Sequence, residues 1–251
     1  MSAEHHATPV QQCVARRRRH AAWAMAAVTL AAAALALLVV TAHLRSGAVH
    51  RLDISIDDKV NRYVHRHPAE VNGWKVITTV GGPTTWRILA GIAAVVLWLR
   101  HRRREAVLVA VAIGAAAALS GLVKLLVARP RPVVPFPIER LGGNHSFPSG
   151  HALTSATALA LVVILAAPRL SALPRALLIS ISTVLGLLIG GSRLMLGVHY
   201  LSDILAGWLI AGLLLTAAIT TTNSHWLTGR RFIHDDLTAS RGQPPAESGP
   251  Q

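Results

Sequence analysis

The chain alternates between long apolar stretches and short polar or basic segments. Six of these stretches approach the length that crosses a bilayer as a helix, roughly 20 residues each. They cover residues 21–42, 84–99, 106–128, 151–167, 176–196 and 200–219. The pattern predicts an all-α protein, built as a bundle of six transmembrane helices.

Residues 43–82 form a long polar connection between the first two stretches. Apolar residues recur in it at steps of three and four, which predicts an amphipathic helix lying in the membrane interface. They are Val49, Leu52, Ile56, Val60 and Val64. We interpret this helix as an interfacial strut, with a lid over a site as the alternative. Gly81, Gly82 and Pro83 then predict a turn that starts the second stretch.

The composition favours a membrane protein over a soluble domain. Of the 251 residues, 52% are hydrophobic and 14% are charged, and the mean hydropathy is +0.47. The formal net charge is +14, but the arginines cluster between apolar stretches and aromatic residues make up only 4%. This distribution indicates membrane orientation rather than nucleic-acid binding. Cys13 is the sole cysteine, which excludes an internal disulfide and a cysteine metal cluster.

The basic clusters predict how the chain is oriented. Clusters at residues 16–19, 102–104 and 230–231 place both termini in the cytoplasm by the positive-inside rule. The expected organisation is a cytoplasmic basic tail at 1–20, a six-span domain at 21–219, and a cytoplasmic tail at 220–251 that is disordered at its end. The first stretch is long enough to be an anchor, with a cleaved signal peptide as the alternative. If residues 84–99 did not cross, the orientation of all later segments would invert.

Polar residues gather at four helix ends that this alternation places on the outer side. They are Lys124, Arg129, Arg131, Ser149, Gly150, His151, Ser192, Arg193, His199 and Asp203. Charges beside membrane spans usually signal a function or a pair. Arginine offers a planar fork that matches phosphate oxygens two at a time, and lysine adds a point charge. Each cation alone could be a snorkelling anchor, but three cations with two histidines favour a phosphate site.

Two local patterns refine this site. Ser149 follows Pro148 and is expected to cap the apolar helix after it, so that free N–H groups point at an anion over Ser149 and Gly150. His199 and Asp203 are four residues apart and therefore share one helix face, where the carboxylate can hold the imidazole in one tautomer.

These motifs occur in a characteristic order. Lys124 is followed, after six residues, by Arg131-Pro132; then come Pro148-Ser149-Gly150-His151, and Ser192-Arg193 with five residues before His199 and three more before Asp203. The order resembles the complete three-part signature of the type 2 phosphatidic acid phosphatase superfamily. That group includes bacterial lipid phosphatases, glucose-6-phosphatase and vanadium haloperoxidases. The resemblance covers about residues 119–206, and the six spans point to its bacterial membrane lipid phosphatase branch.

The resemblance implies a role for each signature residue. His199 would attack phosphorus and form a phosphohistidine, Asp203 would orient His199, and His151 would protonate the leaving oxygen. The phosphoryl oxygens would be bound by Lys124, Arg131, Ser149, Gly150, Ser192 and Arg193. No metal and no other cofactor is expected. Arg129 is not a signature residue and is expected only to support its loop.

The function expected from these residues is a membrane phosphatase that acts on a lipid phosphate or diphosphate at the outer leaflet, with undecaprenyl diphosphate as the best guess. Phosphatidylglycerol phosphate, phosphatidate and a lipid phosphotransferase reaction are the alternatives. Haloperoxidases of this superfamily are soluble, so six spans argue against that activity. A transporter or scaffold with a relict anion site would need neither nucleophile nor acid. Membrane lipids are the expected partners, nucleic acid is not, and the oligomeric state stays open.

Overall fold

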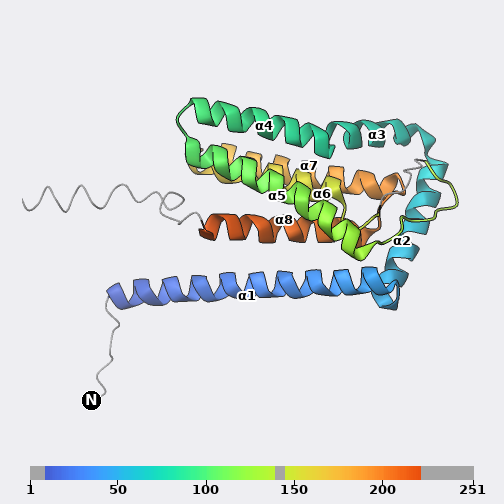
Figure 1. Cartoon of the computed structure of the whole chain (residues 1–251), viewed down its shortest axis with the longest axis horizontal. Helices are drawn as coiled ribbons and strands as arrows, with labels where there is room; N and C mark the ends of the chain where they lie inside the picture. The colour runs from blue at the N-terminus through green and yellow to red at the C-terminus, as the bar shows by residue number, and fades with distance from the viewer. Residues whose placement is uncertain (1–8, 139–144, 222–251) are drawn as a thin grey trace, which may run out of the picture. The chain divides into compact units, whose positions relative to one another are not determined.

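The computed structural model describes residues 9–138 and 145–221, in which every regular element is helical (Figure 1). The α-helices are α1 (Pro9–Leu44), α2 (Gly47–Arg66), α3 (Val71–Val80), α4 (Pro83–Leu99), α5 (Arg103–Val127), α6 (Gly150–Ala166), α7 (Ala172–Met195) and α8 (Leu201–Thr221). Two short 3₁₀ turns, η1 (Pro68–Glu70) and η2 (Ala167–Arg169), precede α3 and follow α6. The all-α prediction is confirmed.

Six segments of the described chain are long and apolar enough to cross a membrane. They are Ala27–Leu44, Pro68–Leu99, Arg103–Val127, Gly150–Arg169, Ala172–Met195 and Leu201–Ile219. Consecutive spans run in opposite directions (Figure 1). The C-terminal ends of α5 and α7 therefore lie at the same end of the bundle as the N-terminal ends of α6 and α8, and α2 lies across that end. The fold is that of a multi-pass membrane protein.

The structure includes more of the predicted N-terminal tail than of the predicted C-terminal tail. Helix α1 begins at Pro9, so it extends into the basic tail predicted at residues 1–20. The first of two structural units ends at Leu215, and the second, Thr216–Gln251, is described only as the end of α8. The predicted C-terminal tail, with its arginine pair at 230–231, lies outside the described residues from 222 onward.

The second span starts earlier than the sequence predicts. The connection expected at residues 43–82 holds α2, but it also holds η1 and α3, and the apolar span begins at Pro68 instead of residue 84. The predicted turn at Gly81 and Gly82 separates α3 from α4. An added Cβ at Gly81 would lie only 2.5 Å from the side chain of Ile189 on α7. Because glycine has no side chain, this turn can approach α7 closely. The sequence pattern did not predict this approach.

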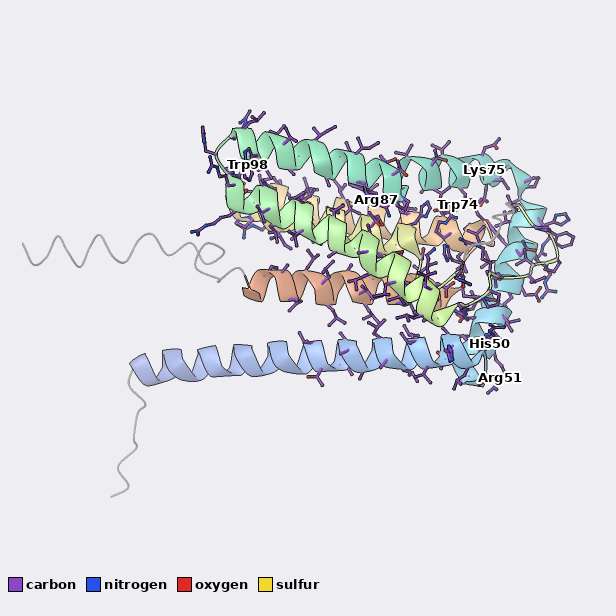
Figure 2. All side chains as sticks on the ribbon, viewed as in Figure 1. His50, Arg51, Trp74, Lys75, Arg87 and Trp98 are labelled. Atoms are coloured by element: carbon purple, nitrogen blue, oxygen red, sulfur yellow. The ribbon has the colours of Figure 1, made fainter. Side chains whose placement is uncertain are left out.

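Helix α4 exposes apolar side chains over its whole length. None of its residues is buried, and Ile88, Ile92 and Val95 are 57%, 57% and 59% exposed. In a membrane protein such side chains face lipid rather than water. Figure 2 shows Arg87 in the N-terminal half of α4 and Trp98 near its other end.

Helix α2 is amphipathic as predicted, but its buried face is mainly polar. Asp53, Asp57, Asn61 and Val64 are buried. Of the predicted apolar stripe, only Val64 is fully buried, and Leu52 is exposed. Asn61 fixes the helix to the loop after α5, because its side chain donates to the Phe136 carbonyl at 2.8 Å and accepts from the Phe136 N–H at 3.0 Å. Packing against protein, rather than against the membrane surface, decides which face of α2 is buried.

Candidate active site

The signature residues lie at the end of the bundle where α3, α5, α6, α7 and α8 meet. The Ser149 N–H donates to the Asp203 carbonyl at 3.0 Å, which joins the start of α6 to the first turn of α8. Arg131 donates to the Val198 carbonyl at 2.7 Å and joins the loop after α5 to the turn between α7 and α8. Segments far apart in the sequence therefore contribute to one site.

Ser149 forms the N-terminal cap of α6, as predicted. Its backbone is extended, and its Oγ accepts from the Ala152 N–H at 3.5 Å. The preceding Phe147–Pro148 peptide bond is cis, and both Phe147 and Ser149 are fully buried. The cap leaves the N–H groups of the first turn of α6 directed at the site, where the helix dipole favours an anion.

His199 lies in the short turn between α7 and α8. Gly197 adopts a φ of +67° there, a left-handed conformation that suits glycine. His199 Nδ1 is 3.4 Å from Asp203 Oδ2, without the alignment of a hydrogen bond, while the same oxygen accepts from the Tyr200 N–H at 3.0 Å. The other ring nitrogen, Nε2, is 3.4 Å from Arg131 Nη1. One edge of the imidazole thus faces a carboxylate and the other faces a cation.

The environment keeps the His199 ring neutral near pH 7. Burial lowers the pKa of His199 from 6.5 to about 4, with Asp203 opposing this shift and the charges of Arg131 and Arg193 contributing to it. With a proton on Nδ1 beside Asp203, the lone pair is on Nε2. A neutral imidazole with its lone pair beside a guanidinium is suited to attack an anion held by that guanidinium.

Three cations gather near His199: Arg131 and Arg193 act on its ring, and Lys124 lies close to both of them. Arg193 is buried and donates to Thr78 Oγ1 at 2.5 Å, which fixes the guanidinium against α3. Lys124 is half-buried in the last turn of α5 and lies close enough to Arg131 and Arg193 for their charges to act on it. Such a cluster is mutually repulsive, so an anion between the cations stabilises it. A phosphoryl group has the charge and the oxygens to do so.

Thr78 also contacts the second histidine of the signature. The His151 ring interacts with the backbone of Thr78 through a hydrogen bond, and a Cβ added at Gly82 would be 3.7 Å from His151 Nε2. Thr78 therefore supports both His151 and Arg193. Sequence reasoning missed Thr78 because it is uncharged and lies in the stretch that was assigned to the polar connection at residues 43–82. It stands one turn before the turn at Gly81 and Gly82.

Ser192 and Gly150 have specific local surroundings. Ser192 is buried, and its Oγ donates to the Ile189 carbonyl of its own helix at 2.7 Å. A Cβ added at Gly150 would lie 3.3 Å from Ser120 Oγ, so the backbone passes close to α5. The roles of Ser192 and Gly150 as phosphate ligands stay predictions.

Arg129 has a larger part in this region than the sequence indicated. It is 1% exposed and forms ion pairs with Asp53 of α2 at 2.8 Å and with Asp203 at 2.6 Å. We expected it only to support its loop, and Asp53 was not expected in the site at all. The repeated Arg-Pro at residues 129–132 was the sequence feature that could have indicated a role for Arg129.

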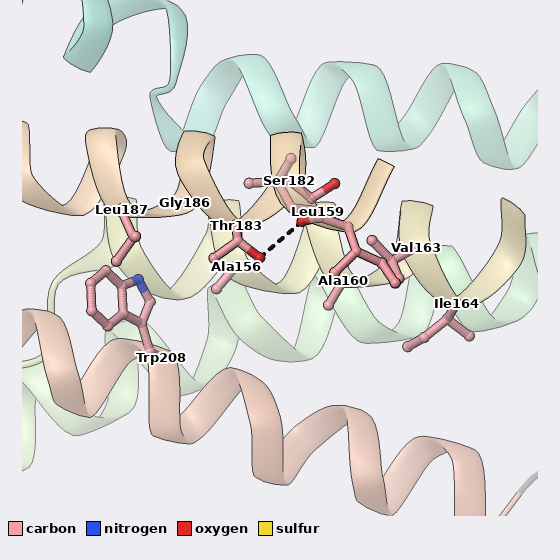
Figure 3. Close-up of a pocket in the computed structure, with 11 residues that line it drawn as sticks. Ala156, Leu159, Ala160, Val163, Ile164, Ser182, Thr183, Gly186, Leu187 and Trp208 are labelled. Carbon is pink, nitrogen blue, oxygen red and sulfur yellow. Dashed lines mark hydrogen bonds between the residues drawn. The ribbon is translucent and has the colours of Figure 1, made fainter. Parts of the chain in front are cut away.

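An apolar pocket opens within the membrane-spanning part of the bundle. It lies between α6 and α7, has a volume of about 440 Å³, and is bordered by Trp208 of α8 (Figure 3). Its walls include Leu159, Val163, Gly186 and Leu187, and none of the signature residues lines it. Across the residues that the structure describes, no group of three or more His, Cys, Asp or Glu side chains is placed to hold a metal ion.

Comparison with known proteins agrees with this arrangement. Residues 105–226 match the family model of the PAP2 superfamily. A search of the curated proteins gives no match. Among solved structures, the chain is similar to the crystal structure of the first transmembrane PAP2 type phosphatidylglycerolphosphate phosphatase from Bacillus subtilis. The TM-score is 0.65 at 23% identity, over 82% of this chain and 98% of that chain. At this identity the similarity supports the fold.

Proposed function

Because residues 105–226 match the PAP2 superfamily model and the chain has a multi-pass membrane fold, we propose that it is a phosphatase of this superfamily that hydrolyses a lipid phosphate or diphosphate through a phosphohistidine intermediate. The observation that carries the proposal is the position of His199, whose Nδ1 faces Asp203 while its Nε2 lies 3.4 Å from Arg131. That arrangement suits a neutral nucleophile beside a bound phosphoryl group.

The reaction follows in two balanced steps. First, the Nε2 lone pair of His199 forms a bond to the terminal phosphorus, and the bond between that phosphorus and the leaving oxygen breaks. The leaving oxygen belongs to the lipid alcohol in a monoester and to the lipid monophosphate in a diphosphate, and His151 gives it a proton. Then water attacks phosphorus, His151 takes back a proton, and the bond between phosphorus and nitrogen breaks to release phosphate. Asp203 stabilises the positive charge that the phosphorylated ring carries between the steps.

The cations supply the electrostatic part of catalysis. Lys124, Arg131 and Arg193 neutralise charge on the phosphoryl oxygens as it redistributes in the transition state. The N–H groups at the start of α6, next to Ser149 and Gly150, act in the same way because they are already oriented by the helix. No step of this sequence requires a metal ion.

A lipid substrate is supported by where the site lies. It sits at the ends of helices that are long and apolar enough to span a membrane. The pocket between α6 and α7 also offers an apolar surface within the same bundle (Figure 3). A soluble sugar phosphate would use neither feature, whereas a lipid can keep its chain among the helices while its phosphate reaches the cations.

Undecaprenyl diphosphate remains our preferred substrate. Three cations match the charge of a diphosphate better than that of a monoester. Phosphatidylglycerol phosphate is the second candidate, because the similar solved structure is that of a phosphatidylglycerolphosphate phosphatase. Phosphatidate, and transfer of the phosphoryl group to an acceptor other than water, are further alternatives on the same residues.

Phosphate release from purified protein tests the proposal. We expect release from at least one of undecaprenyl diphosphate, phosphatidylglycerol phosphate and phosphatidate in detergent with excess chelator, and inhibition by vanadate, which mimics five-coordinate phosphorus. Comparing the three rates identifies the substrate. Release from none of them, or activity that returns only when magnesium is added, would contradict the proposal.

The orientation of the site is also part of the proposal. We expect both termini in the cytoplasm and the site outside, because the basic segments between spans favour the cytoplasmic side. Val133, which is 97% exposed in the loop after α5, and Ser171, exposed before α7, report opposite sides. In a Cys13→Ser background, Val133→Cys should react with a membrane-impermeant thiol reagent on intact spheroplasts, and Ser171→Cys only after permeabilisation. The reverse pattern would place the site in the cytoplasm.

A further inference from the structure

Arg129 is the centre of a buried network that reaches from α2 to α8. Its Nη1 donates to Asp203 Oδ1 at 2.6 Å and to Ser202 Oγ at 2.7 Å. Its Nη2 donates to Asp53 Oδ2 at 2.8 Å, and its guanidinium lies 4.0 Å from the centre of the Tyr200 ring. All of these contacts are inside the protein, so the guanidinium is held on several sides.

Asp53 ties the same network to the start of α8. Its Oδ1 accepts from the Ser202 N–H at 3.0 Å, and its Oδ2 accepts from the Ser202 Oγ at 2.5 Å. One carboxylate of α2 therefore binds both the backbone and the side chain of the residue next to Asp203. A side chain at a helix start that accepts a free N–H fixes the geometry of that turn.

The consequence concerns how the oxygens of Asp203 are divided. Oδ1 is bound by Arg129, which leaves Oδ2 directed at the Tyr200 N–H and at His199 Nδ1. Because a carboxylate is planar, holding one oxygen sets the direction of the other. Arg129 itself is 1% exposed and faces carboxylates, so it is not placed to bind a substrate phosphate.

We propose that Arg129 and Asp53 are positioning residues that hold Asp203 in the orientation required by His199, so that α2 belongs to the catalytic apparatus. This inference rests on the proposed function for its effect on turnover. The pair acts through Asp203 and does not touch the reacting atoms. The competing explanation is that Arg129 only stabilises the packing of α2 and α8.

Kinetics separate positioning from substrate binding. We expect Arg129→Met to lower kcat by about 100-fold, as misplacement of a catalytic group can, while KM changes less than about threefold. Arg129→Lys keeps the charge but cannot hold two carboxylates with a planar fork, so it should recover only part of kcat. Asp58→Asn is the matched control, because Asp58 is on α2 but pairs only with the exposed Arg62 among the ion pairs of the described residues.

A titration of His199 gives a readout that does not depend on turnover. The charged or titratable groups acting on this ring are Asp203, Arg131, Arg193 and His151. Removing the Arg129 charge leaves the negative charge of Asp203 uncompensated near the His199 ring, so Arg129→Met should raise the pKa of His199 by about 1. Asp53→Asn leaves Arg129 to hold Asp203 more strongly, so it should leave this pKa unchanged or lower it.

Nitrogen-15 NMR of histidine-labelled protein measures these values, with the His199 signals identified by their loss in His199→Asn. A raised pKa in Arg129→Met together with an unchanged or lowered pKa in Asp53→Asn, with Asp58→Asn like wild type, supports the proposal. A packing role predicts that both variants loosen the site and move the pKa upward toward that of an exposed histidine. Both rising, or neither changing, would overturn the inference.

Two further outcomes have defined meanings. If Arg129→Met does not fold, the test rests on Arg129→Lys and Asp53→Asn. A kcat equal to that of wild type in both variants overturns the proposal. A lowered kcat, with no rise in the pKa of His199, supports it. If wild-type protein releases phosphate from no lipid, the proposed function fails, and the titration still judges whether Arg129 and Asp53 control His199.

Discussion

The two ends of α5 carry similar charged groups in opposite surroundings. Past its C-terminal end, Arg129 bridges Asp53 and Asp203, and the three side chains are 2%, 4% and 0% exposed. In its first turn, Glu105 is half-buried at 13% exposed, but it pairs with Arg102 and Arg169, whose side chains are 37% and 52% exposed. Charges that are screened by water contribute little, whereas buried charges depend on their partners. Burial, rather than the number of ion pairs, distinguishes the end of α5 that carries the proposed active site.

The largest effect is expected at the nucleophile. His199→Ala should reduce turnover by at least about 10⁴-fold, because the covalent route is lost and only phosphate binding remains. Phosphate release from the best lipid measures this, with gel filtration and thermal unfolding as controls for folding. Residual activity within about tenfold of wild type, a barrier change of only about 1.4 kcal/mol, would remove His199 from the role of nucleophile.

The next effect tests the buried end directly. Asp203→Asn should lower kcat by about 10³-fold or more, since the amide does not stabilise a charged imidazole. It should also destabilise the protein by about 3 kcal/mol, because Arg129 loses a buried charged partner. Denaturation in detergent measures the second effect. An unchanged stability would mean that the pair between Arg129 and Asp203 does not contribute to the folded state.

A third prediction concerns Asp57, also on the buried face of α2. Burial raises its pKa from 3.8 to about 7, with Asp53, Asp203 and Asp58 adding to the rise and Arg129 opposing it. Because the folded-state pKa is above the unfolded one, the stability contributed by this group is present below about pH 4 and is lost as pH rises through about 7.

Asp57→Asn removes this dependence, since an amide does not ionise. The stability of the variant relative to wild type should increase by about 2 kcal/mol between pH 5 and pH 8. Thermal unfolding of both proteins across that range measures the difference. If the stability difference between variant and wild type is the same at every pH, Asp57 does not titrate in this range. If the variant loses stability relative to wild type as pH rises, the pKa of Asp57 is lowered by folding rather than raised.

The smallest effect is expected at the exposed end of α5. Glu105→Gln breaks the contacts with Arg102 and Arg169, yet it should destabilise the protein by less than about 1 kcal/mol, and this should diminish in high salt. Activity should equal that of wild type. A loss comparable to that of Asp203→Asn would mean that burial does not explain the contrast between the two ends.

Local patterns predicted the parts of the fold that depend on nearby residues. The lengths of the apolar stretches indicated the spans, and Ser149 after Pro148 predicted the start of α6. The four-residue spacing predicted that His199 and Asp203 lie side by side. The partners of Arg129 could not be predicted in this way. Asp53 and Asp203 are 76 and 74 residues away from it, and no local spacing links them.

Helix α3 was missed for a different reason. Its polar residues resemble those of a loop, and its role depends on Thr78 meeting Arg193, which is 115 residues away. The close approach of Gly81 to α7 makes that meeting possible, but a glycine beside a proline predicts only a turn. Tertiary contacts, rather than helix propensity, determine the position of α3 and its contact with the site.

The hydrogen bond from the Ser149 N–H to the Asp203 carbonyl has a consequence for biosynthesis. Chains emerge from the ribosome N-terminal part first, so α6 is made well before α8. Until α8 is in place, the start of α6 lacks this acceptor, and Asp203 is absent from its position beside His199, the proposed nucleophile. The centre is therefore completed by the last span to be made, and a chain released before α8 is inserted would occupy the membrane without acting on its lipids.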